Sequence, residues 1–110
     1  MNVHFSIRSA IPGDLNDIIA LDQVTTRAAK PDYWRGIFAH YVTGEKDDRH
    51  FLVAEADGTV VGFIIGEIRA WEFGSPPCGW VFALTVSPKA REMSVGKRMF
   101  EEICRVSRLY

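Results

Sequence analysis

The chain has 110 residues, of which 47% are hydrophobic and 25% charged, and its net charge at pH 7 is −1. These values indicate one soluble globular domain with a modest core, and they give no global electrostatic case for binding nucleic acid or an anionic membrane. The two cysteines form no C-x-x-C pair, and the sequence shows neither a secretory signal pattern nor an apolar run of membrane-spanning length. We therefore expect a cytoplasmic protein without a metal site.

The first 43 residues predict one strand followed by two helices. Residues 4–8 alternate between polar and apolar side chains, as in a half-buried strand. Pro12 and Asp14 are typical of a helix start, and an apolar stripe follows them. A second helix is expected over residues 32–43. Its aromatic stripe favours core packing, although the region between the helices could instead line a groove for an acceptor substrate; the stripe consists of Trp34, Ile37, Phe38 and Tyr41.

The next part of the chain predicts a β-hairpin. Strands are expected over residues 50–55 and 60–68, joined by a tight turn at Asp57-Gly58, since this pair accepts positive φ at low cost. Gly62 and Gly66 would weaken the second strand unless another element approaches closely or a bulge is needed. A loop rich in proline and glycine is then expected over residues 71–79.

The stretch from Val81 to Glu102 carries the strongest functional signal. It predicts an apolar strand to Val86, a short basic turn, and an amphipathic helix from about Ser94 to Arg108. The first N–H groups of a helix have no partner within it, and the helix dipole adds partial positive charge there. The turn is therefore a candidate site for phosphate or another anion.

The spacing of this turn excludes two common phosphate motifs. It is not the dinucleotide fingerprint G-x-G-x-x-G, and it is not a P-loop, because Arg98 follows Gly96-Lys97 where Ser or Thr is required. The segment Arg91-x-x-Ser94-x-Gly96 instead resembles the acetyl-CoA pyrophosphate loop of the GNAT family of N-acetyltransferases, Q/R-x-x-G-x-G/A. Ser94 departs from the first glycine of that pattern.

Other segments carry the same resemblance in the same order. Residues 7–15, IRSAIPGDL, are similar to the family's opening segment; residues 60–64, VVGFI, are similar to its third strand; and residues 84–88, LTVSP, lead into the loop as the family's do. The resemblance implies a single partial GNAT domain over residues 1–110. Its fold class would be α/β (α+β), a mixed and mostly antiparallel sheet with helices on both faces that lacks the C-terminal strands.

The implied activity is transfer of an acetyl group from acetyl-CoA, the cosubstrate, to an amine. In this resemblance the pantetheine arm lies along residues 84–86, the N–H near Leu84 acts as an oxyanion donor, and the pyrophosphate lies on N–H groups from Met93 to Lys97. The residues expected to bind the cofactor are Leu84, Thr85, Val86, Arg91, Glu92, Met93, Ser94, Val95, Gly96, Lys97 and Arg98.

The catalytic groups are less well specified. Many members of the family place a general base on the strand before the loop, but Trp80 and Phe82 stand at the corresponding positions here and cannot accept a proton. Glu67 is the candidate base, with Glu72, His40 and His50 as alternatives; a solvated strand-end charge is the structural alternative for Glu67.

The strand over residues 80–86 is apolar on both faces, as in a strand covered on both sides. With the chain given, it is expected to form a sheet edge with unpaired backbone groups. We therefore expect either a truncated domain or a homodimer formed through this strand. A non-catalytic CoA-binding or dimerisation module is the alternative function.

Overall fold

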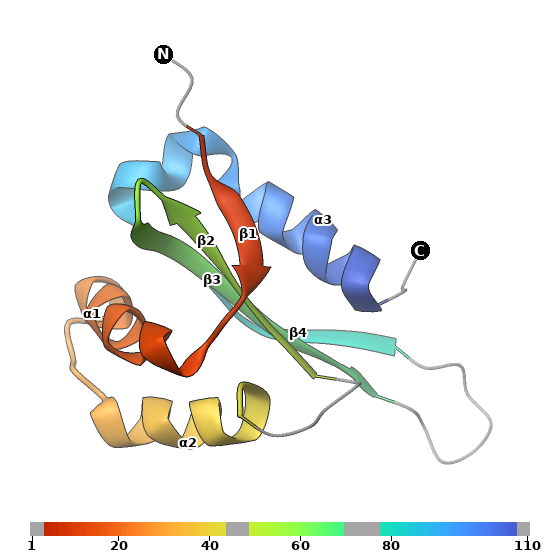
Figure 1. The fold of residues 1–110 in the computed structure, drawn as a ribbon, viewed down its shortest axis with the longest axis horizontal. Coiled ribbons are helices and arrows are strands. Elements are labelled where there is room, and N and C mark those ends of the chain that lie inside the picture. The colour runs from red at the N-terminus through yellow and green to blue at the C-terminus, as the bar shows by residue number, and fades with distance from the viewer. Residues whose placement is uncertain (1–3, 44–48, 70–77, 108–110) are drawn as a thin grey trace.

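The fold of this computed structural model is one antiparallel sheet with helices on both faces, which confirms the predicted fold class (Figure 1). The structure describes residues 4–43, 49–69 and 78–107. The four strands follow the order β1-β2-β3-β4 across the sheet, and all neighbours are antiparallel. The elements are β1 (Ser6–Ser9), the short 3-10 helix η1 (Pro12–Asp14), α1 (Leu15–Thr26), α2 (Pro31–Tyr41), β2 (Arg49–Ala56), β3 (Thr59–Arg69), β4 (Cys78–Val86), the 3-10 helix η2 (Pro88–Met93) and α3 (Val95–Ser107).

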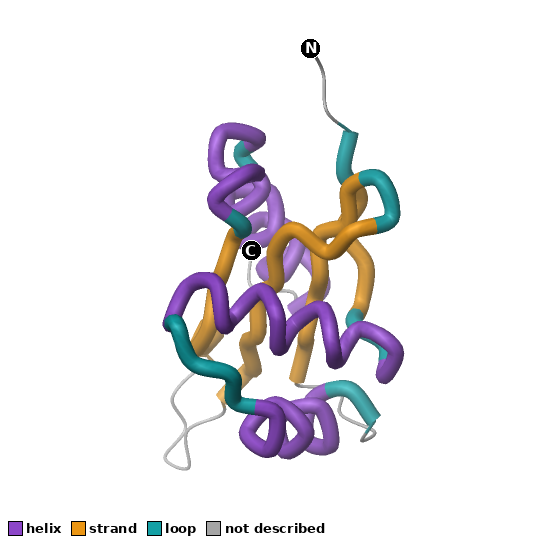
Figure 2. The backbone as a smooth tube through the Cα atoms, turned by 90° about the vertical axis from the view of Figure 1, so that its left-hand side faces the viewer, coloured by secondary structure: helices purple, strands orange, loops and turns teal. Residues whose placement is uncertain are grey.

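The sheet separates two apolar cores. Helices α1 and α2 cover one face and α3 covers the other (Figures 1 and 2). Successive strand residues point to opposite faces, so Val53 packs with α1 and α2 whereas Leu52 packs with α3. Each layer thus buries the apolar stripe of the helix that covers it.

The aromatic stripe of α2 lies in the first core, as predicted. Trp34 is 3% exposed and Phe38 is 4% exposed. Their rings meet Phe51 and Phe63 of the sheet in edge-on arrangements, with centroids 5.1–6.4 Å apart. Such pairs add to the stabilisation that apolar burial alone provides. The Trp34 ring N–H donates to the buried carboxylate of Asp22 over 3.0 Å, and this bond ties α2 to α1.

The hairpin between β2 and β3 forms at the predicted turn. Asp57 and Gly58 have φ of 52° and 76°, the left-handed pair that a tight two-residue turn requires. Two bulges interrupt the ladders, one at Ala54/Glu55 between β2 and β3, and one at Ile65/Gly66 between β3 and β4. The second bulge leaves Phe82 as the extra residue of β4, since Ile65 pairs with Ala83 and Gly66 with Val81.

Gly62 lets α3 approach the sheet closely, as its position in the strand suggested. A Cβ at Gly62 would lie 2.9 Å from Met99 Cε, 3.1 Å from Thr85 O and 3.3 Å from Val95 Cγ1. Met99 and Val95 are both fully buried. The missing side chain therefore sets the distance between α3 and β3.

Strand β4 is at one end of the sheet in the part of the chain that the structure describes. Its side chains Val81 and Leu84 are 41% and 46% exposed. A strand that reads as covered on both faces is thus open along one edge and partly open on the α3 side. The prediction of an open edge is confirmed for the described strands.

A half-buried ion-pair network joins β1 to the start of α1. Arg8 donates to both carboxylate oxygens of Asp14, over 2.8 and 2.9 Å, and to Glu55 over 3.1 Å. The backbone N–H of Ile11 also donates to Asp14, over 2.8 Å. The Arg8 guanidinium lowers the pKa of the Asp14 carboxyl, and the Ile11 N–H acts in the same direction.

This network makes the stability of the fold depend on pH. A carboxyl whose pKa is lower in the folded than in the unfolded chain stabilises the fold above its unfolded pKa of about 4 and loses that contribution as pH falls through its folded pKa. Asp14→Asn is expected to cost about 2 kcal/mol at pH 7, and its unfolding free energy should converge with that of the unchanged protein below pH ~4. Denaturant titrations across this range measure the difference. The exposed Asp17→Asn variant is the control, and parallel pH curves for Asp14→Asn and the unchanged protein would contradict the assignment.

Candidate functional site

The connection between β4 and α3 is a compact 3-10 turn. Pro88 begins it, Ser87 Oγ accepts a hydrogen bond from the Lys89 N–H over 3.4 Å, and the Ala90 N–H donates to Ser87 O over 2.9 Å. Ala90 is 2% exposed and packs with the residues of the α3 core. The Ser87 N–H donates to Val61 O over 2.7 Å. The turn is therefore anchored to the sheet at its start and to the core at its middle.

The N-terminus of α3 is a candidate site for an anion. The Arg98 N–H bonds to Ser94 O over 3.1 Å, an i→i−4 bond at the start of α3. Val95, Gly96 and Lys97 are the first residues of the helix, whose N–H groups have no acceptor within a regular helix. Together with the helix dipole they make this end attractive to an anion.

Ser94 has a backbone conformation that favours glycine. Its φ is 58° and its ψ is 27°, in the left-handed region, where a Cβ is strained. The family pattern noted above has glycine at this position, so the serine keeps the backbone shape of the pattern at an energetic cost. This conformation is not the extended one from which a hydroxyl usually caps a helix.

Gly96 is not explained by packing within the chain. A Cβ there would meet Val86 Cγ2 at 3.6 Å, which is an ordinary van der Waals distance. A glycine in the first turn of α3 leaves its backbone without a covering side chain, which permits close approach of a ligand.

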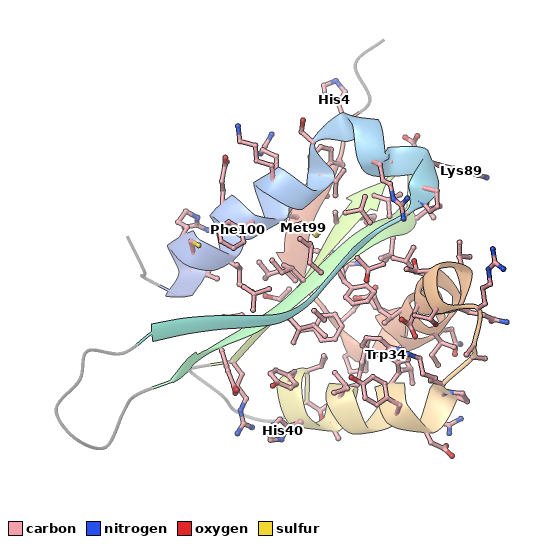
Figure 3. The ribbon with its side chains drawn as sticks, turned by 180° about the vertical axis from the view of Figure 1, so that it is seen from behind. His4, Trp34, His40, Lys89, Met99 and Phe100 are labelled. Carbon is pink, nitrogen blue, oxygen red and sulfur yellow. The ribbon has the colours of Figure 1, made fainter. Side chains whose placement is uncertain are left out.

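The cations that the sequence places around the turn differ in their surroundings. Arg91 is exposed in η2, and Lys97 is exposed with its Nζ 4.0 Å from Glu101. Arg98 points to the other flank of α3, where its guanidinium lies 5.5 Å from the ring centre of Phe5 and lines a hollow of about 360 Å³ beside β1. Lys89 extends outward from the turn (Figure 3).

The other predicted cofactor residues lie around this turn. The strand segment Leu84–Val86 ends next to η2, and the backbone of Glu92 and Met93 forms the last part of η2 before Ser94. Val95 is fully buried, so only its backbone can take part. The bulge at Phe82, which the sequence did not predict, lies just before this segment; bulges are frequent beside functional sites.

Glu67 lies apart from the turn. It pairs across the ladders with Arg49 and Trp80, and its carboxylate Oε2 is 3.7 Å from Arg49 Nε with 15% of the side chain exposed. Leu84 is paired with Ile64, three residues earlier in β3, so Glu67 is roughly 10 Å further along the strand.

Of the alternative proton acceptors, His40 and His50 lie in the described part of the chain and Glu72 does not. His40 Nδ1 is 3.2 Å from Arg49 Nη1, so this imidazole belongs to the same polar group as Glu67. His50 follows Arg49 in β2, and Glu72 lies outside the described residues.

Among residues 4–43, 49–69 and 78–107, no His, Cys, Asp and Glu side chains form a group of three suited to a metal ion. In the same residues, no helix is both long and apolar enough to cross a membrane.

Comparisons with known proteins agree with this geometry. The model of the acetyltransferase (GNAT) family matches residues 15–109. The solved structure of the aminoglycoside N-acetyltransferase AAC(6')-Iy in complex with CoA superposes with a TM-score of 0.78 at 22% identity, over 96% of this chain and 70% of that one. A ribosomal-protein-alanine N-acetyltransferase from Brucella melitensis superposes with a TM-score of 0.70 at 20% identity, over 93% of this chain and 70% of that one. A GNAT family acetyltransferase from Staphylococcus aureus superposes with a TM-score of 0.77 at 13% identity, over 94% of this chain and 78% of that one. A search of curated proteins found no match.

The backbone strain at Ser94 leads to a test of the turn. Ser94→Gly is expected to equal or exceed the unchanged protein in stability, and Ser94→Val to be less stable than the glycine variant by about 2 kcal/mol, because a β-branched residue tolerates positive φ poorly. Thermal and denaturant unfolding measure this order. The same pair of changes at Ser6, an exposed residue of β1, should give the opposite order, since a strand favours valine over glycine. If the valine variant were more stable than the glycine variant at both residue 94 and residue 6, the backbone at Ser94 would not be strained.

Proposed function

Because this chain belongs to the GNAT acetyltransferase family, we propose that it is an acetyl-CoA-dependent N-acetyltransferase that transfers an acetyl group to an amine acceptor. The observation that supports this most directly is the turn from Arg91 to Lys97, in which the left-handed Ser94 leads into the first turn of α3 shortly after the end of β4. The proposed location is the cytoplasm.

The residues of the turn fit a diphosphate. The N–H groups of Val95, Gly96 and Lys97 would donate to phosphate oxygens, and Arg91 would add a full positive charge. Gly96 leaves the backbone accessible, and the left-handed conformation of Ser94 gives the chain the reversal it needs before α3. Lys97 could add a second charge because it is exposed beside the same amides. Arg98 is a weaker candidate, since its guanidinium lies over Phe5.

The open edge of β4 fits the extended arm of the cofactor. Alternate backbone groups of an edge strand point away from the sheet, so the segment Leu84–Val86 can bond to the amide groups of a pantetheine chain. In the family pattern the N–H near Leu84 stabilises the charge that develops on the acetyl oxygen. The bound coenzyme supplies the acetyl group as an activated thioester, while this segment would hold and orient it.

Glu67 is the proton acceptor that we propose for the amine. An amine must be neutral to attack the acetyl group, so a carboxylate that takes up its proton assists the reaction. Glu67 is half-buried and lies on β3 beyond the bulge in the adjoining strand. At roughly 10 Å from the position opposite Leu84, it would act through water rather than by direct contact.

The contact between Glu67 and Arg49 also favours a second function. Glu67 Oε2 lies 3.7 Å from Arg49 Nε, a contact that suits a structural ion pair. A domain that binds CoA without transferring an acetyl group would keep the turn and the β4 edge and need no proton acceptor. The acceptor itself stays open, because the fold serves many amines.

Binding of CoA tests the first part of the proposal. Ligand that binds only the folded state stabilises it by about 2.7 kcal/mol at one hundred times its dissociation constant, so CoA should raise the melting temperature. Arg91→Ala should weaken CoA binding by about tenfold or more, since a hydrogen bond to a charged group is lost. The control is Arg35→Ala, which removes an exposed arginine of α2 that pairs with Asp32. Equal affinities for CoA of Arg91→Ala and the unchanged protein, measured by calorimetry, would contradict the proposed phosphate-binding site.

Turnover tests the second part. With acetyl-CoA and a panel of amines, Glu67→Gln is expected to lower kcat by about one hundredfold and to leave CoA affinity unchanged. Glu55→Gln is the matched control, because Glu55 is also a strand carboxylate paired with an arginine, Arg8. Release of free CoA thiol measures the rate. CoA binding without turnover for any amine would favour the non-catalytic alternative, and an unchanged rate in Glu67→Gln would remove Glu67 as the base.

A further inference from the structure

Ser94 is the residue at which the turn before α3 departs from the family pattern. It stands where the pattern Q/R-x-x-G-x-G/A has its first glycine. The backbone keeps the left-handed conformation that suits glycine, with φ of 58° and ψ of 27°. Glycine adopts this conformation without strain, whereas a residue with a Cβ does not. The shape of the backbone therefore gives no reason for the serine side chain.

The hydroxyl group of Ser94 is available to a ligand. The residue is exposed, and its Oγ makes no hydrogen bond with residues 4–43, 49–69 and 78–107. Ser87, at the start of the same turn, differs in this respect, because its Oγ accepts the Lys89 N–H over 3.4 Å. The hydroxyl of Ser87 is thus used within the turn, whereas that of Ser94 is not.

Covalent geometry holds this hydroxyl close to the first N–H groups of α3. Ser94 Oγ and Val95 N belong to adjacent residues, so the two atoms lie within about 5 Å of each other. A phosphate oxygen that accepts from the N–H of Val95 or Gly96 lies about 3 Å from that nitrogen. Another oxygen of the same phosphate is then within reach of the hydroxyl, which can donate a hydrogen bond to it.

We propose that Ser94 is a specificity-determining residue of the coenzyme site, whose hydroxyl donates a hydrogen bond to the diphosphate. This inference rests on the proposed function, since membership of the family is what makes a diphosphate the expected anion. The hydroxyl adds a directed donor to backbone amides that attract anions in general. With serine in place of glycine, the site discriminates more strongly between thioesters that carry a diphosphate and phosphate-free pantetheine thioesters.

Two variants separate the hydroxyl from the Cβ to which it is attached. Ser94→Ala keeps the Cβ and removes Oγ, and Ser94→Gly removes both. Each variant should bind CoA about tenfold more weakly than the unchanged protein, because a hydrogen bond to a charged group is lost. Pantetheine has no phosphate, so its affinity should be the same for all three proteins. Calorimetry measures both ligands.

Stability measurements show that such a loss does not come from unfolding. Alanine and serine both carry a Cβ at positive φ, so Ser94→Ala should unfold at about the same denaturant concentration as the unchanged protein, and Ser94→Gly at the same or a higher one. The matched control is Ser9→Ala, which removes an exposed hydroxyl at the end of β1 and should leave CoA affinity unchanged.

Other results would overturn the inference. Equal CoA affinities for Ser94→Ala and the unchanged protein would remove the role of the hydroxyl and leave the proposed function standing. Tighter CoA binding by Ser94→Gly would show that the Cβ obstructs the ligand instead. Inorganic pyrophosphate is the second probe: if it binds more weakly to Ser94→Ala while CoA binds to neither protein, the hydroxyl contact is supported and the proposed function is overturned. Binding of neither CoA nor pyrophosphate would overturn both.

Discussion

The contact between α3 and the sheet at Gly62 fixes the geometry on which the candidate site depends. Met99 and Val95 fill the space that a side chain at residue 62 would occupy, and this closeness holds the first turn of α3 level with the end of β4. A helix N-terminus attracts anions only within its first turn. The position of that turn beside residues 84–86 is therefore what makes one site from a strand edge and a helix end, and it is set by packing rather than by any charged group.

The sequence predicted the features that local chemistry dictates. The Asp57-Gly58 hairpin, the aromatic stripe of α2 and the buried face of α3 follow from turn propensity and periodicity, and the close approach at Gly62 follows from a glycine inside an apolar strand. Each of these signals lies within a few residues, and its tertiary context agrees with it.

The features that the sequence did not predict arise from contacts between distant segments. The bulge that makes Phe82 the extra residue depends on how β4 meets β3, and nothing in the two strands taken singly marks it. Arg98 is one of the cations that the sequence places around the turn, and its guanidinium lies 5.5 Å from the ring centre of Phe5, a residue more than ninety positions earlier. The left-handed conformation of Ser94 could be inferred only from the glycine of the family pattern.

The outer position of β4 in the described sheet bears on both the candidate cofactor edge and the candidate base. A sheet buries its central strands well and its outer strands poorly, so a backbone edge free to hold an extended ligand is also free to hold another strand. Glu67 lies on β3, one strand in from that edge, where Arg49 can neutralise it and where solvent reaches only part of its side chain. A carboxylate on β4 itself would lie closer to the proposed position of the acetyl group. The described strand β4 carries no carboxylate, which leaves Glu67, one strand inward on β3, as the candidate proton acceptor at roughly 10 Å from the position opposite Leu84.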